Sequence, residues 1–82
     1  MKTQKVSRGI YFLPHHGLYI VGAPNFNNPH GRAHYSVQDW VAVETHQEAH
    51  AISHGKRITM DDVLYVHNTK KALLRVIERE WL

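Results

Sequence analysis

The chain has 82 residues, 43% of them hydrophobic and 21% charged, which is the composition of one small globular domain rather than of a disordered segment. No apolar run approaches the roughly 18 residues of a membrane helix, and residues 10–13 are too short for a signal-peptide core. The absence of cysteine excludes disulfides, thiolate metal sites and cysteine nucleophiles. We therefore expect a single cytoplasmic domain over residues 1–82, with no membrane partner and with a basic, flexible or edge segment over residues 1–8.

Two short apolar runs predict a β-hairpin near the N-terminus. Residues 9–14 and 18–21 are rich in aromatic and β-branched side chains, and a short link containing Gly17 joins them. Tyr11 and Tyr19 are expected to face each other across this hairpin. Residues 25–32 have the Asn, Gly and Pro content of a loop. A third antiparallel strand is predicted over residues 35–43, and a helix from Ser36 is the rival interpretation.

Two helices are predicted from capping patterns. Thr45 with Glu48 three residues later is the pattern of a capping box, and it predicts a helix over residues 46–54 that ends at Gly55. A second helix is expected over residues 70–81, capped by Asn68 or Thr69, with an apolar face directed to the core.

The segment 57–67 has two interpretations. Thr59 and Asp62 could cap a helix that starts at Met60, or two strands over residues 57–60 and 63–67 could turn between them. The dense β-formers of residues 63–66 favour the strands. Together the elements predict a two-layer α+β domain, in which an antiparallel sheet of three or more strands packs against a short central helix and a C-terminal helix.

The histidines form the most conspicuous pattern. His46, His50 and His54 lie at i, i+4 and i+8 of the first predicted helix, where imidazoles one turn apart can share a divalent metal. The helix is short and lacks the H-E-x-x-H motif, so a solvated face is favoured and neither a metal nor another cofactor is expected. His15-His16 is typical of the paired imidazoles of ribonucleases, but no cation is fixed beside it.

Two groups of residues are candidates for contact with a partner. Lys71, Arg75 and Arg79 recur every four residues on the last helix, where like charges repel and an anionic partner would offset the repulsion. Glu78 and Glu80 dilute this row of cations, so an ordinary solvated face is the favoured alternative interpretation. Phe26 and Arg32 lie in the polar loop, and an exposed aromatic near an arginine has the composition of an interface anchor. The alternative is that Phe26 folds back to cover the small core. No residue is assigned a catalytic role, because no nucleophile-elbow, phosphate-loop or helix-turn-helix pattern is satisfied.

In size and general character, a small α+β chain without a catalytic motif resembles phage- or plasmid-encoded inhibitor proteins such as anti-CRISPR proteins. The resemblance assigns no functional role to any residue of this chain. The resemblance implies a non-enzymatic protein that binds a larger complex and acts as its inhibitor. A protein is the favoured partner, and a homodimer is left open. The first alternative is a nucleic-acid-binding protein that uses the basic C-terminal helix with Lys2, Lys5 and Arg8. The second is a histidine-based ribonuclease or metal-binding protein.

Overall fold

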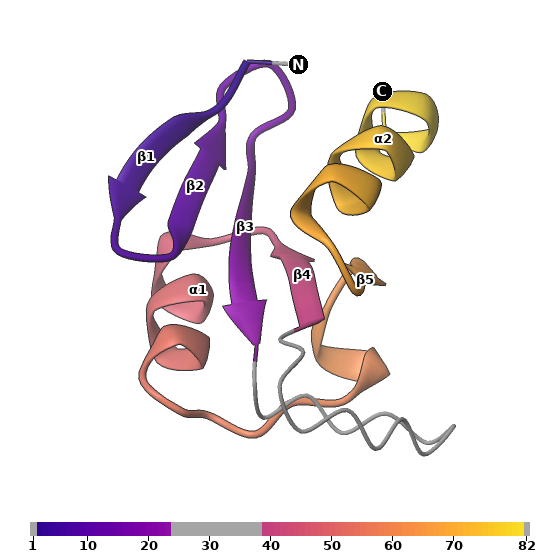
Figure 1. The fold of residues 1–82 in the computed structure, drawn as a ribbon. Coiled ribbons are helices and arrows are strands. Elements are labelled where there is room, and N and C mark those ends of the chain that lie inside the picture. Colours follow the sequence, from indigo (N-terminus) through magenta and orange to yellow (C-terminus); the bar gives the residue numbers. More distant parts are fainter. Residues whose placement is uncertain (1, 24–38, 82) are drawn as a thin grey trace.

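Five strands form one antiparallel sheet, in the order β1-β2-β3-β4-β5 (Figure 1). The structure is a computed structural model, and it describes residues 2–23 and 39–81, except for the side chain of Met60. The strands are β1 (Gln4–Ser7), β2 (Ile10–Leu13), β3 (Leu18–Ala23), β4 (Asp39–Val43) and β5 (Tyr65–His67). The helical segments are α1 (His46–Ser53), the 3-10 turn η1 (Met60–Asp62) and α2 (Lys70–Glu80). The predicted α+β class, with helices packed on an antiparallel sheet, is confirmed.

The predicted hairpin is formed by β2 and β3, which pair antiparallel over residues 10–13 and 18–21. The amides of His16 and Gly17 donate to the carbonyl of Leu13 and close the turn between the strands. Gly17 has a φ of +66°, a conformation that is strained for residues with a side chain, so this position in the turn favours glycine.

The predicted pairing of Tyr11 with Tyr19 is wrong. Phe12 is the residue opposite Tyr19, with ring centroids 4.8 Å apart, whereas Tyr11 lies opposite Ile20. Because successive side chains of a strand point to opposite faces, a register offset of one residue places the two tyrosines on different faces of the sheet.

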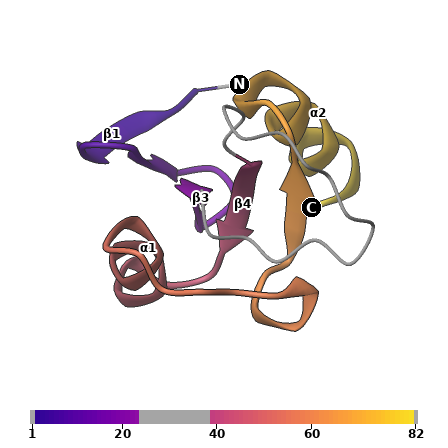
Figure 2. The same ribbon diagram turned by 60° about the horizontal axis from the view of Figure 1, so that its bottom comes forward.

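The two helices pack on opposite faces of the sheet, as Figure 2 shows. Under α1, the buried residues are Ile10, Val21, Ala23, Val41, Val43, Ala49, Ile52 and Ile58. Under α2, they are Leu13, Leu18, Ile20, Ala42, Leu73 and Ile77. Each helix therefore makes a two-layer packing with its own face, and this is why three successive residues of β4, Val41, Ala42 and Val43, are all buried.

The sheet has two different edges. β1 lies at one edge, where all four of its residues are exposed, and its register with β2 shifts between Lys5 and Ser7. The other edge is the three-residue strand β5. At β4, the predicted strand is confirmed for residues 39–43, whereas residues 35–38 lie outside the described part of the chain.

A threonine is the N-cap residue of each α-helix. The Oγ1 atoms of Thr45 and Thr69 accept hydrogen bonds of 3.1 Å from the amides of Glu48 and Ala72, as the capping patterns predict. Such bonds satisfy amides that have no partner inside the helix. Within the described residues, no helix has the length and apolar character needed to cross a membrane.

The segment between α1 and β5 combines parts of both interpretations. Thr59 forms a full capping box with Asp62, but the helix that it begins is only the 3-10 turn η1. Residues 65–67 then form β5, so the predicted strand over residues 63–67 is confirmed in its second half. The predicted strand over residues 57–60 is wrong, because only Ile58 makes a bridge, and its buried side chain fixes the segment against the core under α1.

Candidate functional site

The outward side of α2 carries the three predicted cations. Lys71, Arg75 and Arg79 are exposed, whereas Leu73 and Ile77 on the inward side of the helix are fully buried. No ion pair with another described residue neutralises any of the three cationic side chains. Four residues of an α-helix rise about 6 Å, so the row presents three positive charges over roughly 12 Å. We call this surface, made of Lys71, Arg75 and Arg79, the basic face.

The first residue of α2 joins the basic face to the sheet. The Nζ atom of Lys70 lies 3.4 Å from the ring centroid of Tyr11, which is a cation–π contact. The half-buried rings of Tyr11 and Trp40 are 6.3 Å apart. Lys5 of β1 lies opposite Tyr11, and directly opposed residues project from the same face of a sheet. Cations from the N-terminal and C-terminal segments are therefore brought to one face around Tyr11.

The other two predicted partner-binding residues, Phe26 and Arg32, lie outside the described residues. The N-terminal cations Lys2 and Arg8 are exposed, as Lys5 is. Of the five residues predicted to bind a protein partner, only the three on α2 therefore lie within the described part of the chain.

The histidines of α1 form a stack of rings along one exposed side of the helix. Ring centroids are 6.1 Å apart for His46 and His50 and 4.1 Å apart for His50 and His54, and the edge of the stack meets Tyr19 at 5.7 Å. The predicted common face is confirmed. In the described part of the chain, no group of three or more histidine or carboxylate residues is arranged to hold a metal ion.

One hydrogen bond fixes the tautomer of His54. Its Nδ1 atom lies 2.9 Å from the carbonyl oxygen of His50, and a carbonyl can only accept. The neutral ring therefore carries its proton on Nδ1 and leaves Nε2 as an acceptor. Only the imidazolium form of His54 can donate a hydrogen bond from Nε2.

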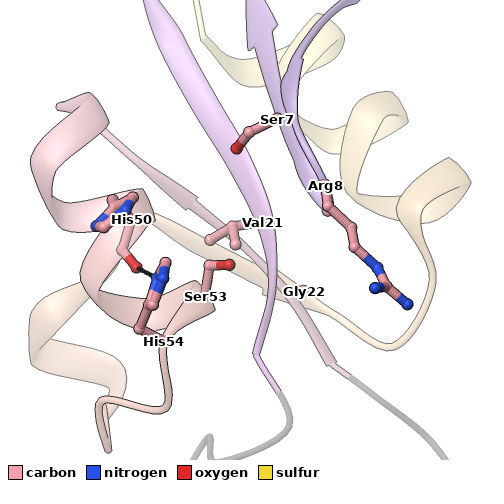
Figure 3. Close-up of a pocket in the computed structure, with 8 residues that line it drawn as sticks. Ser7, Arg8, Val21, Gly22, His50, Ser53 and His54 are labelled. Atoms are coloured by element: carbon pink, nitrogen blue, oxygen red, sulfur yellow. Dashed lines mark hydrogen bonds between the residues drawn. The ribbon is translucent and has the colours of Figure 1, made fainter.

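His50 and His54 border a cleft of about 520 Å³ between α1, β3 and the turn that joins β1 to β2 (Figure 3). Figure 3 shows the hydroxyls of Ser7 and Ser53 directed into the space between α1 and the strands, while Arg8 extends beside Gly22 on the side away from the histidines. The lining residues are Ser7, Arg8, Gly9, Val21, Gly22, His50, Ser53 and His54. The lining residues thus include an arginine, two histidines and two serines, and no acidic residue is among them. We call this space the histidine cleft.

A second, smaller cleft of about 190 Å³ has the opposite chemistry. Four carboxylates line it together with apolar side chains, namely Glu44, Glu48, Asp61 and Asp62. The carboxylates of this smaller cleft do not line the histidine cleft.

The paired histidines of the β2–β3 turn have a structural contact. The carbonyl oxygen of His16 accepts a 3.0 Å hydrogen bond from Nε1 of Trp81, which follows α2. The Nδ1 atom of His16 is buried and has no hydrogen-bond partner among the described residues. The turn therefore holds the end of α2 against the sheet, and no described cation bonds to His16 to complete a ribonuclease-like set.

The sequence did not indicate the histidine cleft, because its polar groups come from segments that are far apart in the chain. Arg8 and Ser7 belong to the β1–β2 turn, and the histidines and Ser53 belong to α1. Only the packing of α1 against the sheet beside β1, β2 and β3 brings them together. The spacing of residues within one segment of the sequence does not indicate that packing.

Comparison of the chain with protein-family models, with curated proteins and with solved structures found no match.

Proposed function

We propose that this chain is a non-enzymatic binding protein that acts in the cytoplasm by contact with a macromolecular partner, and that the basic face of α2 contacts the phosphate backbone of a nucleic acid. The observation that carries the proposal is the row of Lys71, Arg75 and Arg79, exposed and without an ion pair among the described residues. Occlusion of the bound surface, as in small inhibitor proteins of the anti-CRISPR type, is the proposed mode of action.

The electrostatics of α2 favour an anionic partner. Like charges four residues apart on a helix repel by a few tenths of a kcal/mol per pair. Lys70 and Lys71 also occupy the first turn of α2, where the helix dipole disfavours cations. A bound polyanion would remove both penalties at once, and the net charge of +3 would attract it from a distance.

The burial pattern supports binding rather than catalysis. No polar or charged side chain is buried among the described residues, whereas catalytic groups are commonly held in desolvated, preorganised sites. The chemical groups of the described surface are exposed instead, which suits contact with another macromolecule.

The proposal is tested by fluorescence anisotropy with a labelled DNA duplex and a labelled RNA strand, each of about 20 nucleotides per strand, at low salt. The triple variant Lys71→Ala/Arg75→Ala/Arg79→Ala should weaken binding by about tenfold or more, since each lost phosphate contact removes a charge-assisted bond. The control is Lys56→Ala/Arg57→Ala, which removes two cations from exposed positions outside the predicted nucleic-acid-binding residues. Equal losses per cation removed in both variants, or no binding by the wild type, would refute the proposal.

A protein partner, favoured from the sequence, remains a second candidate because of β1. This edge strand is exposed along its whole length, and Val6 within it keeps 42% of its surface accessible. An exposed edge can pair with a strand of another protein or of a second copy of this chain. Light scattering over a range of protein concentrations tests the homodimer: a mass that doubles in the wild type but not in Val6→Glu supports it, and a constant monomer mass removes it.

A further inference from the structure

Two aromatic side chains, Tyr11 on β2 and Trp40 on β4, come together on the α2 side of the sheet, and we call them the aromatic pair. Strand β3 separates β2 from β4, so the backbones of these two strands are about 9–10 Å apart. The ring centroids nevertheless lie 6.3 Å apart. Gly22 of β3 lies directly opposite Trp40 and has no side chain, which leaves room for the indole to reach across β3.

The aromatic pair is not sealed inside the core. Both side chains are half-buried and pack at the margin of the buried cluster under α2. The Nε1 atom of Trp40 and the hydroxyl of Tyr11 form no hydrogen bond with a described residue, whereas Nε1 of Trp81 donates to His16. Tryptophan and tyrosine that are buried for stability alone usually find a partner for these polar atoms. The aromatic pair therefore has the character of a contact surface.

Cations surround the aromatic pair, and acidic side chains are directed away from it. The Nζ atom of Lys70 lies 3.4 Å from the ring centroid of Tyr11. Exposed Lys5 lies opposite Tyr11 on β1, so the two side chains share a face of the sheet. Asp39 is the one acidic residue in the five strands of the described chain, and as the neighbour of Trp40 in β4 it projects from the opposite face. The charge of this surface favours an anion.

We infer that this surface binds single-stranded nucleic acid, with a base stacked on Trp40 and phosphates bonded to Lys5 and Lys70. The inference rests on the proposed function and deepens it, because it names the form of nucleic acid that reaches the basic face. Lys70 joins the two surfaces, since the next residue, Lys71, begins the basic face. A strand that leaves the aromatic pair can therefore continue along α2.

The aromatic pair selects for unpaired bases. In a duplex the bases are stacked on one another and present only their edges in the grooves, so a ring on the sheet cannot reach their faces. Aromatic rings on a sheet beside cations are a recurrent platform for single strands. Because Lys70 covers one face of Tyr11, we assign the principal stacking contact to the indole of Trp40. The planes of the two rings are inclined at 46°, so Tyr11 does not stack face to face on this indole.

The experiment measures the affinity of three labelled probes by fluorescence anisotropy. The probes are single-stranded oligothymidylate, an abasic phosphodiester chain and a DNA duplex, each of about 20 nucleotides per strand. Trp40→Leu removes the indole but keeps an apolar side chain, and Trp40→Phe restores a ring. Phe12→Leu is the matched control, since Phe12 is also a half-buried ring of the sheet but contacts Tyr19 on the α1 side.

The wild type should bind the single strand more tightly than the abasic chain. Trp40→Leu should weaken binding of the single strand by about 5- to 100-fold, as loss of one stacked base usually does. Its affinities for the abasic chain and the duplex should stay within about twofold of the wild type, because phosphate contacts remain. Trp40→Phe should recover most of the loss, and Phe12→Leu should bind all probes as the wild type does.

A second measurement observes the stacking itself. The chain has two tryptophans, so Trp81→Phe leaves Trp40 as the one indole. The single strand should quench the fluorescence of Trp40 in this variant, and the abasic chain should not.

The triple variant of the basic face separates this inference from the proposed function, since it should weaken binding of all three probes. Equal affinity of the wild type for the single strand and the abasic chain, equal losses in Phe12→Leu and Trp40→Leu, or unchanged fluorescence of Trp40 would overturn the inference and leave phosphate binding by α2 intact. If instead the triple variant binds every probe as the wild type does, the assignment to α2 is wrong, while a loss confined to Trp40→Leu with the single strand would still support the stacking site.

Discussion

The indole nitrogen of Trp81 donates a hydrogen bond of 3.0 Å to the carbonyl oxygen of His16, and this bond joins the end of α2 to the β2–β3 turn. The same indole ring meets the ring of Tyr65 edge-on, with 6.4 Å between centroids. The amide of Trp81, the C-cap residue of α2, also donates to the carbonyl of Ile77 in the last turn of the helix. Trp81 therefore fixes the direction of α2 on the sheet, and with it the side on which the basic face lies.

Trp81→Phe should lower the free energy of unfolding by about 1 kcal/mol, because it leaves the partly buried carbonyl of His16 without its donor. In a domain of this size the corresponding loss in Tm is about 4–8 °C. Thermal and urea unfolding followed by circular dichroism measure it. Tyr65→Phe is the control, since it retains the ring that contacts Trp81, and unchanged stability in Trp81→Phe would contradict this role of the bond.

Thr69→Ala should destabilise the domain by about 1 kcal/mol, since the amide of Ala72 loses the side-chain oxygen that caps α2. Thr69→Ser keeps this oxygen and should stay close to the wild type in urea unfolding. If the serine variant were as unstable as the alanine variant, the methyl group of Thr69 rather than its hydroxyl would be responsible.

Buried residues on both faces of the sheet should contribute to the stability of the domain. Ile52 under α1 and Ile77 under α2 are almost fully buried, so Ile52→Val and Ile77→Val should each reduce stability by about 0.5–1.5 kcal/mol. Because the two residues belong to separate clusters, the double variant should show the sum of the two effects within about 0.5 kcal/mol. A neutral Ile52→Val would mean that α1 does not pack on the sheet.

The elements with strong local signals could be predicted from the sequence. The hairpin, the two capped helices and the exposure of Lys71, Arg75 and Arg79 follow from residue patterns that need no distant contact. The length of the helix after Thr59 could not be predicted, because a capping box signals a start but not how far the helix continues.

Features that depend on packing were missed for a physical reason. β1 is exposed on both faces and has Val6 as its one apolar residue, so its sequence has no alternation to indicate that it pairs with β2. The position of Tyr11 beside Lys70 and Trp40 depends on the register of the hairpin and on where α2 begins above the sheet. The histidine cleft likewise needs α1 and the β1–β2 turn to be placed in space before its polar groups meet.

The most direct test of the central claim is the salt dependence of nucleic-acid binding by the wild type and by Lys71→Ala/Arg75→Ala/Arg79→Ala. For duplex DNA, the slope of log affinity against log salt concentration changes by about 0.9 for each phosphate contact. Loss of all three cations of the basic face should therefore reduce the magnitude of the slope by roughly 2–3, while Lys56→Ala/Arg57→Ala leaves it near the wild-type value. Parallel slopes for all three proteins would contradict the assignment of phosphate binding to α2.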